Sequence, residues 1–373
     1  MGDSTQMPGV VLVTQPGPPG NRLYLTLGGK MLSERAGEVL NILVDEYINS
    51  ASPVASEDIA HRSLVKVSSA TIRSTMSQLT EEGYISRPHI SAGAVPRNRA
   101  YRHYVESLKS PPQLPVDLRA EINGYFQQAY LDVETWSRQC AAILSRISTN
   151  MAIVTVPWAK SPKLKQVQLV YLEEYLVLLV VVLQETRLLR RLIPLDEPTT
   201  PSHLDQVTNV LNENLGAMDY RQLEAARLEL NPLETRVKNE TIEMLRDTET
   251  AKSPQHYVDG LRWLLNQPEF SRDGSANELV ELLEEDVLLD SILAGKAQPE
   301  NVSVYIGEEN QDETLRPFGV IVCHYGVGQQ ATGTICVIGP TRMGYSQAIG
   351  GVSFLSSLMS QLVGELYASD SLI

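Results

Sequence analysis

VSSATIR at residues 67–73 and RPHISAG at residues 87–93 are the two stretches of this chain that decide its fold. The first begins a candidate helix with small polar residues and one arginine, and the second has the proline and glycine of a tight turn. Between Leu32 and Leu108 the predicted order is helix, helix, turn, helix and a short basic ribbon. This order predicts a winged helix-turn-helix, a fold that most often binds DNA.

The first helix of this segment is expected to begin at Ser33, because serine is a good N-cap and Glu34 suits the positive end of the helix dipole. Ser56 is expected to cap a short second helix, and Ser68 a third that Gly83 ends. In the first helix, apolar residues recur at spacings of three and four, which indicates one buried face. The residues of that face are Ala36, Val39, Leu40, Leu43 and Tyr47.

The third helix has two unlike faces. Ile72, Met76 and Leu79 fall on one side and are expected to pack inward. Because successive helical residues turn by about 100°, the opposite side is small and polar with a single arginine. It is formed by Ala70, Arg73, Ser74 and Ser77. Small residues let a helix lie deep in the major groove, and an arginine can contact guanine or phosphate.

We therefore predict a DNA-binding surface on the third helix and the basic ribbon. Its residues are Ser68, Ser69, Ala70, Thr71, Arg73, Ser74, Ser77, Arg87, His89, Arg97, Arg99 and Arg102. From His61 to Lys109, eight Lys and Arg stand against three Glu, a local charge of +5 in a chain of net charge −14. The remainder carries −19, but phosphate binding needs positive charge only locally. The alternative is a winged helix that binds protein, with its charges on a solvated face.

Several short blocks resemble the family of bacterial heat-inducible transcription repressors called HrcA. The N-terminal blocks are LSER at 32–35, PVAS at 53–56, SATIR at 69–73, GYI at 83–85, PHISAG at 88–93 and YRHYV at 101–105. The C-terminal blocks are IGEEN at 306–310 and VIGPTRMGY at 337–345. Because blocks from both ends match in order, the resemblance extends over most of the chain.

The resemblance implies a cytoplasmic, dimeric repressor of heat-shock (chaperone) operons with no enzymatic activity. In that family the dimer binds an inverted-repeat operator called CIRCE and is released on heat stress, and the chaperonin GroEL maintains its activity. The implied fold class is α+β and multidomain. It has an N-terminal winged helix-turn-helix and a GAF-like α/β domain that a mostly helical dimerisation domain interrupts.

We accordingly predict a flexible, Gly- and Pro-rich extension at residues 1–30 and a winged-helix DNA-binding domain at 31–110. The GAF-like domain is expected at 111–195 and 297–373, and the inserted dimerisation domain at 196–296. The β-rich runs Leu164–Leu172 and Leu176–Leu183 fall in the first part of the GAF-like domain. The insertion is charged and mostly helical, and it includes an acidic amphipathic helix over Glu278–Leu293.

Catalytic and cofactor chemistry has little support in the sequence. The six histidines show no HExxH or paired-ligand spacing, and the three cysteines form no CxxC pair. We therefore expect no cofactor, no metal and no catalytic residue. The most apolar run, Leu176–Leu183, is too short to span a bilayer. The alternative function is a winged-helix regulator of the IclR type, whose GAF-like domain binds a small effector.

Overall fold

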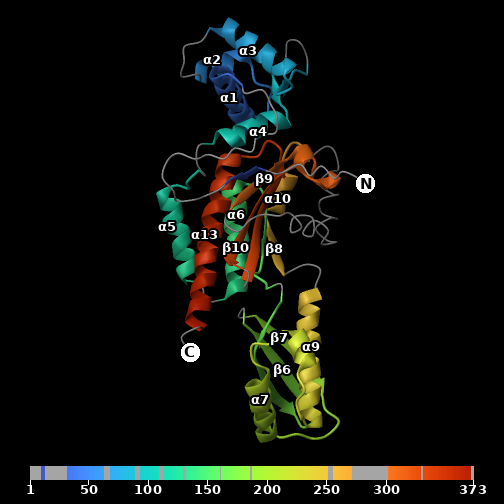
Figure 1. Ribbon diagram of the computed structural model, residues 1–373. Coiled ribbons are helices and arrows are strands. Elements are labelled where there is room, and N and C mark those ends of the chain that lie inside the picture. The colour runs from blue at the N-terminus through green and yellow to red at the C-terminus, as the bar shows by residue number, and fades with distance from the viewer. Residues whose placement is uncertain are drawn as a thin grey trace, which may run out of the picture. The chain divides into compact units, whose positions relative to one another are not determined.

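The computed structural model describes residues 10–12, 32–62, 68–88, 93–108, 112–128, 132–159, 161–184, 187–250, 255–270, 301–328 and 331–370 (Figure 1). These residues form two compact units. One contains the N-terminal helices and a six-stranded sheet, and the other is built mainly from residues 157–254. Both units combine helices with sheets, in agreement with the predicted α+β class.

Four helices and a two-stranded ribbon build the N-terminal part of the first unit. The elements are α1 (Glu34–Ser50), α2 (Ser56–Arg62), α3 (Ser69–Glu81), β2 (Ile85–Ser86), β3 (Val95–Pro96) and then α4 (Asn98–Ser107). Ser33 and Ser68 cap α1 and α3 as predicted, each accepting a hydrogen bond from a backbone N–H in the first turn. Leu40, Ile59 and Ile72 are fully buried where the first three helices pack together.

The ribbon is antiparallel, with Ile85 opposite Pro96 and Ser86 opposite Val95. A bridge between Ala94 and Val54 joins it to the segment that connects α1 and α2. This approach requires a glycine at position 93, because a Cβ on Gly93 would lie 2.5 Å from the backbone of Pro53. Residues 89–92, where the tip of the predicted wing falls, lie outside the described residues.

A six-stranded sheet forms the centre of the first unit, with the strand order β1-β9-β10-β11-β4-β8. Its strands are β1 (Val10–Leu12), β4 (Met151–Thr155), β8 (His256–Asp259), β9 (Val302–Ile306), β10 (Phe318–Val327) and β11 (Ala331–Pro340). The β1–β9, β9–β10, β11–β4 and β4–β8 pairs are antiparallel. Every residue of β4 is buried, as expected for a strand with neighbours on both sides.

Helices complete the core around this sheet. They are α5 (Val116–Gln128), α6 (Val133–Ser148), α10 (Leu261–Leu265) and α13 (Tyr345–Asp370). α6 packs on β4 and β8 and lies close to α13, since a Cβ on Gly351 would be 3.0 Å from Leu144. Phe270, after α10, stacks on Phe318 of β10 with ring centres 4.9 Å apart. Both rings belong to an apolar cluster that also contains Met151 and Ile153.

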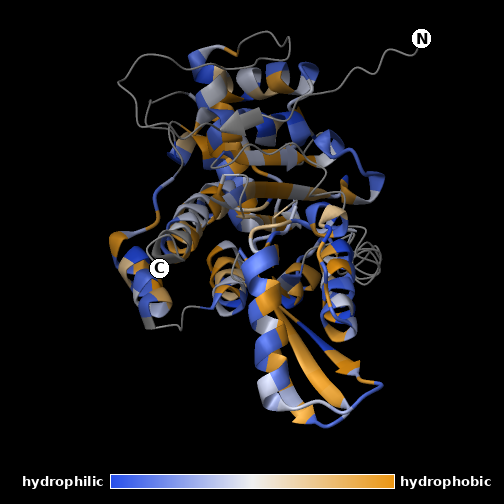
Figure 2. Cartoon of the chain, turned by 60° about the horizontal axis from the view of Figure 1, so that its bottom comes forward, coloured by the Kyte–Doolittle hydropathy of each residue, from blue (hydrophilic) through white to orange (hydrophobic). Residues whose placement is uncertain are grey.

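Residues 157–254 form a separate three-stranded antiparallel sheet with its own helices. The elements are β5 (Leu164–Glu173), β6 (Leu176–Leu183), β7 (Leu188–Pro194), α7 (Pro201–Leu215), α8 (Tyr220–Ala225) and α9 (Pro232–Thr250). Alternate residues of the strands, such as Val167, Leu179 and Ile193, are buried in one cluster with residues of α7 and α9. The strands of this sheet are strongly hydrophobic (Figure 2).

The limits of this unit differ from our prediction. We expected the insertion to begin at residue 196 and the strands before it to join the main sheet. β4 does join the main sheet, but β5, β6 and β7 instead pair with one another, while β8, expected inside the insertion, pairs with β4. Alternating hydrophobicity reports that a strand has a buried face but not which sheet it joins. The predicted helix at Glu278–Leu293 lies outside the described residues.

The N-terminal extension also differs from our prediction in one place. Val10–Leu12 form a strand that pairs with Val302–Val304 at the edge of the main sheet. The pairing supplies backbone partners to an edge strand that would otherwise present unpaired N–H and C=O groups. The other residues of the range 1–30 lie outside the described part of the chain.

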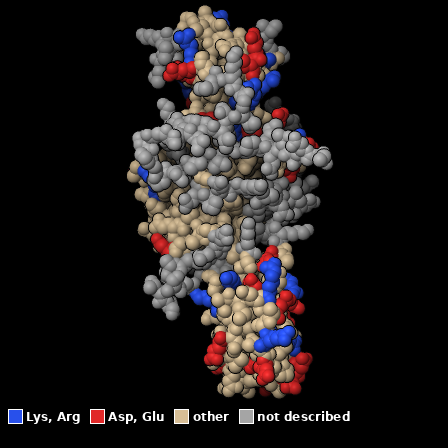
Figure 3. All heavy atoms as spheres, viewed as in Figure 1, with Lys and Arg blue, Asp and Glu red and all other residues tan. Residues whose placement is uncertain are grey.

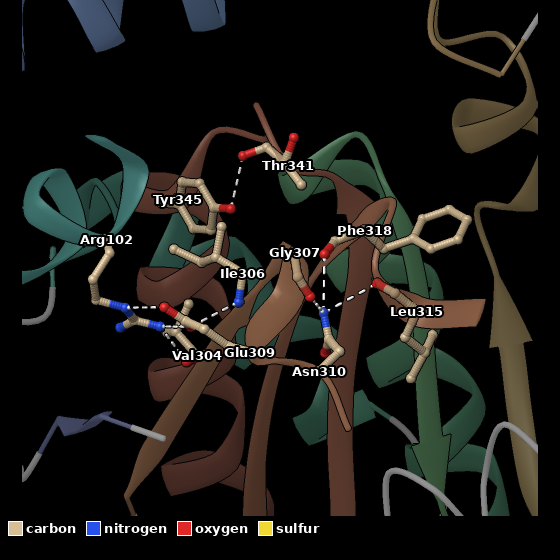
Figure 4. Close-up of polar contacts among 10 residues, drawn as sticks. All are labelled: Arg102, Val304, Ile306, Gly307, Glu309, Asn310, Leu315, Phe318, Thr341 and Tyr345. Carbon is tan, nitrogen blue, oxygen red and sulfur yellow. Dashed lines mark hydrogen bonds and ion pairs between the residues drawn. The ribbon is translucent and has the colours of Figure 1, made fainter. Parts of the chain in front are cut away.

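One buried amide holds the loop between β9 and β10. Nδ2 of Asn310 donates to the carbonyl oxygens of Gly307 and Leu315, each at 3.0 Å, and lies 3.1 Å from that of Phe318 (Figure 4). The Asn310 residue is only 6% exposed. One side chain therefore contacts three carbonyl groups of this loop, and that of Gly307 also accepts from the backbone N–H of Asn310 at 3.1 Å.

We expect Asn310→Asp to lower the free energy of unfolding by about 3 kcal/mol, because it removes both donors and places a carboxylate against three carbonyl oxygens. Urea denaturation followed by tryptophan fluorescence measures the change. Asn214→Asp, at an exposed position of α7, is the matched control and should change stability by less than about 0.5 kcal/mol. Equal losses in the two variants would contradict a specific role for Asn310.

Candidate nucleic-acid interface

α3 begins with hydroxyl groups around its N-terminus. Oγ of Ser68 accepts a hydrogen bond from the N–H of Thr71 at 3.2 Å and lies 2.9 Å from Oγ1 of Thr71. Ser68 is exposed, whereas Ser69 and Thr71 are half-buried. The N–H groups at a helix N-terminus carry partial positive charge, and this end of α3 can therefore bind an anionic phosphate oxygen.

The two faces of α3 are as the spacing predicts. Ile72, Met76 and Leu79 are buried against the other helices. On the opposite side, the exposed residues are Ala70, Arg73, Ser74 and Ser77. A face of this kind has little side-chain bulk, so the helix backbone can approach a groove closely.

Arg73 is the one charged residue on that exposed face. Its Nε donates to the carbonyl oxygen of Ser69 at 3.4 Å, one turn earlier in the helix. Oγ of Ser77 donates to the carbonyl of Arg73 itself at 3.0 Å, so the serine hydroxyl lies along the helix rather than across the face. The guanidinium group can present paired N–H donors to a guanine edge or to a phosphate.

The arginines of the ribbon differ in how firmly they are held. Arg97 is exposed at the N-cap of α4. Arg99 is also exposed, but its Nη1 donates to the carbonyl oxygen of Glu82 at 2.7 Å and its guanidinium lies 4.7 Å from the centre of the Tyr84 ring. Arg87 is half-buried. Arg97 and Arg99 thus keep positive charge at the surface beside the ribbon.

Of the other two predicted DNA-binding residues, one is outside the described part of the chain and one lies elsewhere. His89 lies outside the described residues. Arg102 points from α4 toward the six-stranded sheet, and its side chain, 15% exposed, forms an ion pair with Glu309 (Figure 4). The prediction grouped Arg102 with the basic ribbon because of its sequence position, but its place on α4 puts it against an acidic partner. We therefore exclude Arg102 from the candidate interface.

The charges around the interface are mixed rather than uniformly basic. Figure 3 shows both Lys or Arg and Asp or Glu side chains on the visible face of the N-terminal helices. Arg62, which contributes to the +5 charge of the segment, is paired with Glu46 at 2.8 Å and with Asp45 at 3.7 Å. Among the described residues of this segment, the positive charge without a carboxylate partner is therefore concentrated on Arg73 and the ribbon arginines.

His103 adds no positive charge to this region at neutral pH. The residue lies on α4 beside the ring of Tyr84, with ring centres 6.3 Å apart. Burial lowers its pKa below the ordinary value, because the charged imidazolium would lose its hydration. His103 therefore belongs to the packing of α4 on α1 rather than to an electrostatic contact with phosphate.

Besides Arg102, an arginine that was not in the predicted set contacts the N-terminal helices. Arg342, after β11, is 12% exposed and is paired with Glu269. Its Nη2 donates to Oε1 of Gln267 at 2.8 Å, and its Nη1 lies 3.4 Å from the carbonyl oxygen of Ile48 near the end of α1. Sequence reasoning missed these partners because residues far apart in one sequence carry no signal that they meet.

Metal ligands, thiols and membrane-spanning helices are the other features relevant to function. Among the residues that the structure describes, no cluster of three or more His, Cys, Asp and Glu side chains could hold a metal ion. Cys140, Cys323 and Cys336 are buried free thiols. Within the same residues, no helix combines the length and apolar character needed to cross a membrane.

Sequence comparisons agree on one family. The family model described as "HrcA protein C terminal domain" matches residues 134–349. The heat-inducible transcription repressor HrcA of Dehalococcoides mccartyi (strain 195) is 39% identical over 337 residues, which cover 90% of this chain and 97% of that protein. The protein of the same name from Thermomicrobium roseum is 33% identical over 335 residues, which cover 90% of this chain and 96% of that protein.

A solved structure is similar to the whole chain. A crystal structure described as that of a hypothetical protein, at 2.2 Å resolution, aligns with a TM-score of 0.65 and 22% sequence identity. The alignment covers 90% of this chain and 99% of that one. This similarity establishes that the two chains share a fold.

Proposed function

The chain belongs to the HrcA family of heat-inducible transcription repressors, as its sequence motifs predicted, and we propose that it represses chaperone operons by binding DNA. In this proposal residues 32–108 act as a winged helix-turn-helix in the cytoplasm. α3 enters the major groove of an inverted-repeat operator of the CIRCE type, and a homodimer presents one α3 to each half-site.

The observation that carries the proposal is the exposed face of α3. A helix that only packed against a protein partner would be expected to carry apolar or aromatic anchors at the centre of the contact. The exposed face instead has small residues around Arg73. The ribbon adds two surface arginines beside it, Arg97 and Arg99. This arrangement matches base reading by the helix and phosphate contact by the ribbon.

We expect Arg73→Ala to weaken operator binding by about 1–3 kcal/mol and to relax base preference, because it removes the charged donor aimed at the groove. Arg97→Ala should weaken specific and random duplexes alike and reduce the slope of log affinity against log salt. Fluorescence anisotropy with a CIRCE-type duplex and a scrambled duplex, at several salt concentrations, measures both effects.

The control for this experiment is Arg146→Ala, an exposed arginine on α6. It removes the same charge from the chain without touching α3 or the ribbon. Unchanged operator affinity in the Arg73 variant, or equal losses in the Arg73 and Arg146 variants, would contradict the assignment of α3 as the DNA-reading helix.

The outer face of the three-stranded sheet supports dimerisation through residues 157–254. Its residues, opposite the face that packs on α7 and α9, are Gln166, Gln168, Val170, Glu173, Leu176, Leu178, Val180, Val182, Leu188, Arg190, Leu192 and Pro194. Val170 is 39% exposed, Leu188 60% and Leu192 57%. A contiguous apolar surface of this kind usually marks an interface. An inverted repeat has two-fold symmetry, and a second copy of the chain is the partner that matches it.

This placement of the interface differs from the one drawn from the sequence. We expected the contact within residues 196–296, whereas the apolar face belongs to β5, β6 and β7. The helices of the unit lie on the other side of the sheet, where their apolar residues are already buried. The strands are therefore the better candidates for contact with a second copy.

We expect the double variant Leu188→Asp and Leu192→Asp to raise the dissociation constant of the dimer by about a hundredfold or more, since each subunit then buries two unpaired carboxylates. Sedimentation velocity over a range of protein concentrations measures the shift. Val116→Asp changes a residue on α5 that is 69% exposed and serves as the matched control. A dimer of unchanged stability in the double variant would contradict this interface.

Heat release is the remaining part of the proposal. Stability margins of folded domains are only about 5–15 kcal/mol, and in a multidomain chain one domain can unfold before the others. If the free energy of unfolding of a repressor is small, a temperature rise of a few degrees lowers the fraction of the protein that is folded and active. If the GroEL chaperonin restores the folded state, misfolded clients that occupy the chaperonin will lower the level of active repressor.

We expect the purified protein to lose operator binding within the stress range of its organism and to regain it when chaperonin and ATP are added. Anisotropy with the operator duplex at stepped temperatures measures the active fraction. Loss only well above that range, with no recovery on addition of chaperonin, would contradict the feedback mechanism while leaving DNA binding intact.

A further inference from the structure

The structure assigns a positioning role to the ion pair of Arg102 and Glu309. We infer that this pair fixes the orientation of α3 and its ribbon relative to the six-stranded sheet, and that the dimer needs this fixed orientation to bind two half-sites together. The inference rests on the proposed function, because it concerns how the DNA-reading element is held.

The pair has the geometry of a bidentate ion pair, in which two nitrogens of the guanidinium contact the two oxygens of one carboxylate. Nε of Arg102 donates to Oε1 of Glu309 at 2.8 Å, and Nη2 donates to Oε2 of the same group. Nη2 also donates to the carbonyl oxygen of Val304 at 2.7 Å (Figure 4). A bidentate arginine fixes direction as well as distance, which a lysine in the same place would not do.

Glu309 is itself held in place by the sheet. Its Oε2 accepts a hydrogen bond from the backbone N–H of Ile306 at 2.9 Å. Its carboxylate therefore links the end of β9 to α4, and the neighbouring residue Asn310 anchors the same loop through three carbonyl groups. An ion pair between two fixed partners loses less side-chain entropy than one between two mobile side chains.

The contacts around the pair are close and buried. The rings of Tyr101 on α4 and Tyr345 on α13 lie 6.2 Å apart, and both residues are at most 3% exposed. Gly307 approaches the start of α4 so closely that a Cβ would lie 2.1 Å from Nδ2 of Asn98. The Arg102–Glu309 pair thus lies within a packed joint rather than on an open surface.

The positioning role of the ion pair follows from the elements that it connects, which are α4 and the end of β9. α4 is continuous with the ribbon through the N-cap Arg97, so the orientation of α4 sets the orientation of the ribbon and, through the shared core, of α3. Binding of two linked sites is strong only when the linkage holds both sites at the right geometry. A loosened joint should therefore weaken binding to a paired site while leaving a single half-site almost unaffected.

The test compares Arg102→Ala, Glu309→Ala and the exchanged pair Arg102→Glu with Glu309→Arg on two duplexes. One duplex carries the complete inverted repeat and the other carries one half-site. For both single variants we expect the dissociation constant to rise about tenfold on the complete repeat and to change by less than about twofold on the half-site. The exchanged pair should not recover the loss, because it places the carboxylate against the carbonyl oxygen of Val304 and the guanidinium against the N–H of Ile306.

Glu308→Ala is the matched control, because this exposed acid is adjacent in sequence and carries the same charge. It should stay within about twofold of the unmodified protein on both duplexes. If Arg102 contacted phosphate instead, Arg102→Ala would weaken both duplexes and Glu309→Ala would weaken neither. That result overturns the inference, as does tighter binding of the complete repeat by both single variants.

Hydrogen exchange separates this inference from the proposed function. Amides of α4 and β9 should exchange faster in the Arg102→Ala and Glu309→Ala variants than in Glu308→Ala, with or without DNA. If the unmodified protein binds neither duplex, the proposed function fails. If it binds both and the two variants show unchanged exchange and unchanged affinity, the positioning role fails alone.

Discussion

An arginine withdrawn from water must keep its charge, and it therefore needs a carboxylate and further acceptors around it. Arg102 and Arg342 both meet this requirement between the N-terminal helices and the sheet, with Glu309 and Glu269 as their partners. Each also reaches a backbone carbonyl, that of Val304 for Arg102 and that of Ile48 for Arg342. Because one arginine projects from each side of the joint, the two together restrain the N-terminal helices more than either could alone.

The same requirement decides how much positive charge is left for nucleic acid. The chain has 31 Lys and Arg against 45 Asp and Glu, so acidic groups outnumber basic groups by 14. Among the described residues, Arg62, Arg191 and Arg236 are paired with carboxylates in their own units. Charges that stay unpaired act on a polyanion over roughly the Debye length, about 8–10 Å at moderate salt. In the proposed function, a small group of surface arginines on α3 and the ribbon supplies the positive charge that directs an acidic protein to DNA.

The sequence predicted local structure well and long-range pairing poorly, for a physical reason. A 3.6-residue period shows directly which side of α3 is buried, and the burial of Ile72 and Leu79 agrees with it. The caps Ser33 and Ser68 act within one turn and could be predicted as well. The local sequence of a strand does not specify which other strand it pairs with. The sequence therefore could not assign β5, β6 and β7 to a sheet of their own. Likewise, the partner of Arg102 is 207 residues away in the chain, and no spacing rule connects them.

Electrostatics also helps to explain why one face of the three-stranded sheet is available for a partner. On α9, Glu240, Glu243 and Asp247 gather around the single guanidinium of Arg191, which leaves an excess of negative charge on that side. Two copies that met through α9 would bring these carboxylates together and would repel each other. The opposite face of the sheet is mainly apolar, and its charged residues among the described strands are Glu173 and Arg190. In the proposed dimer, repulsion on one side and apolar surface on the other both favour contact through the strands, with the charged helix in solvent.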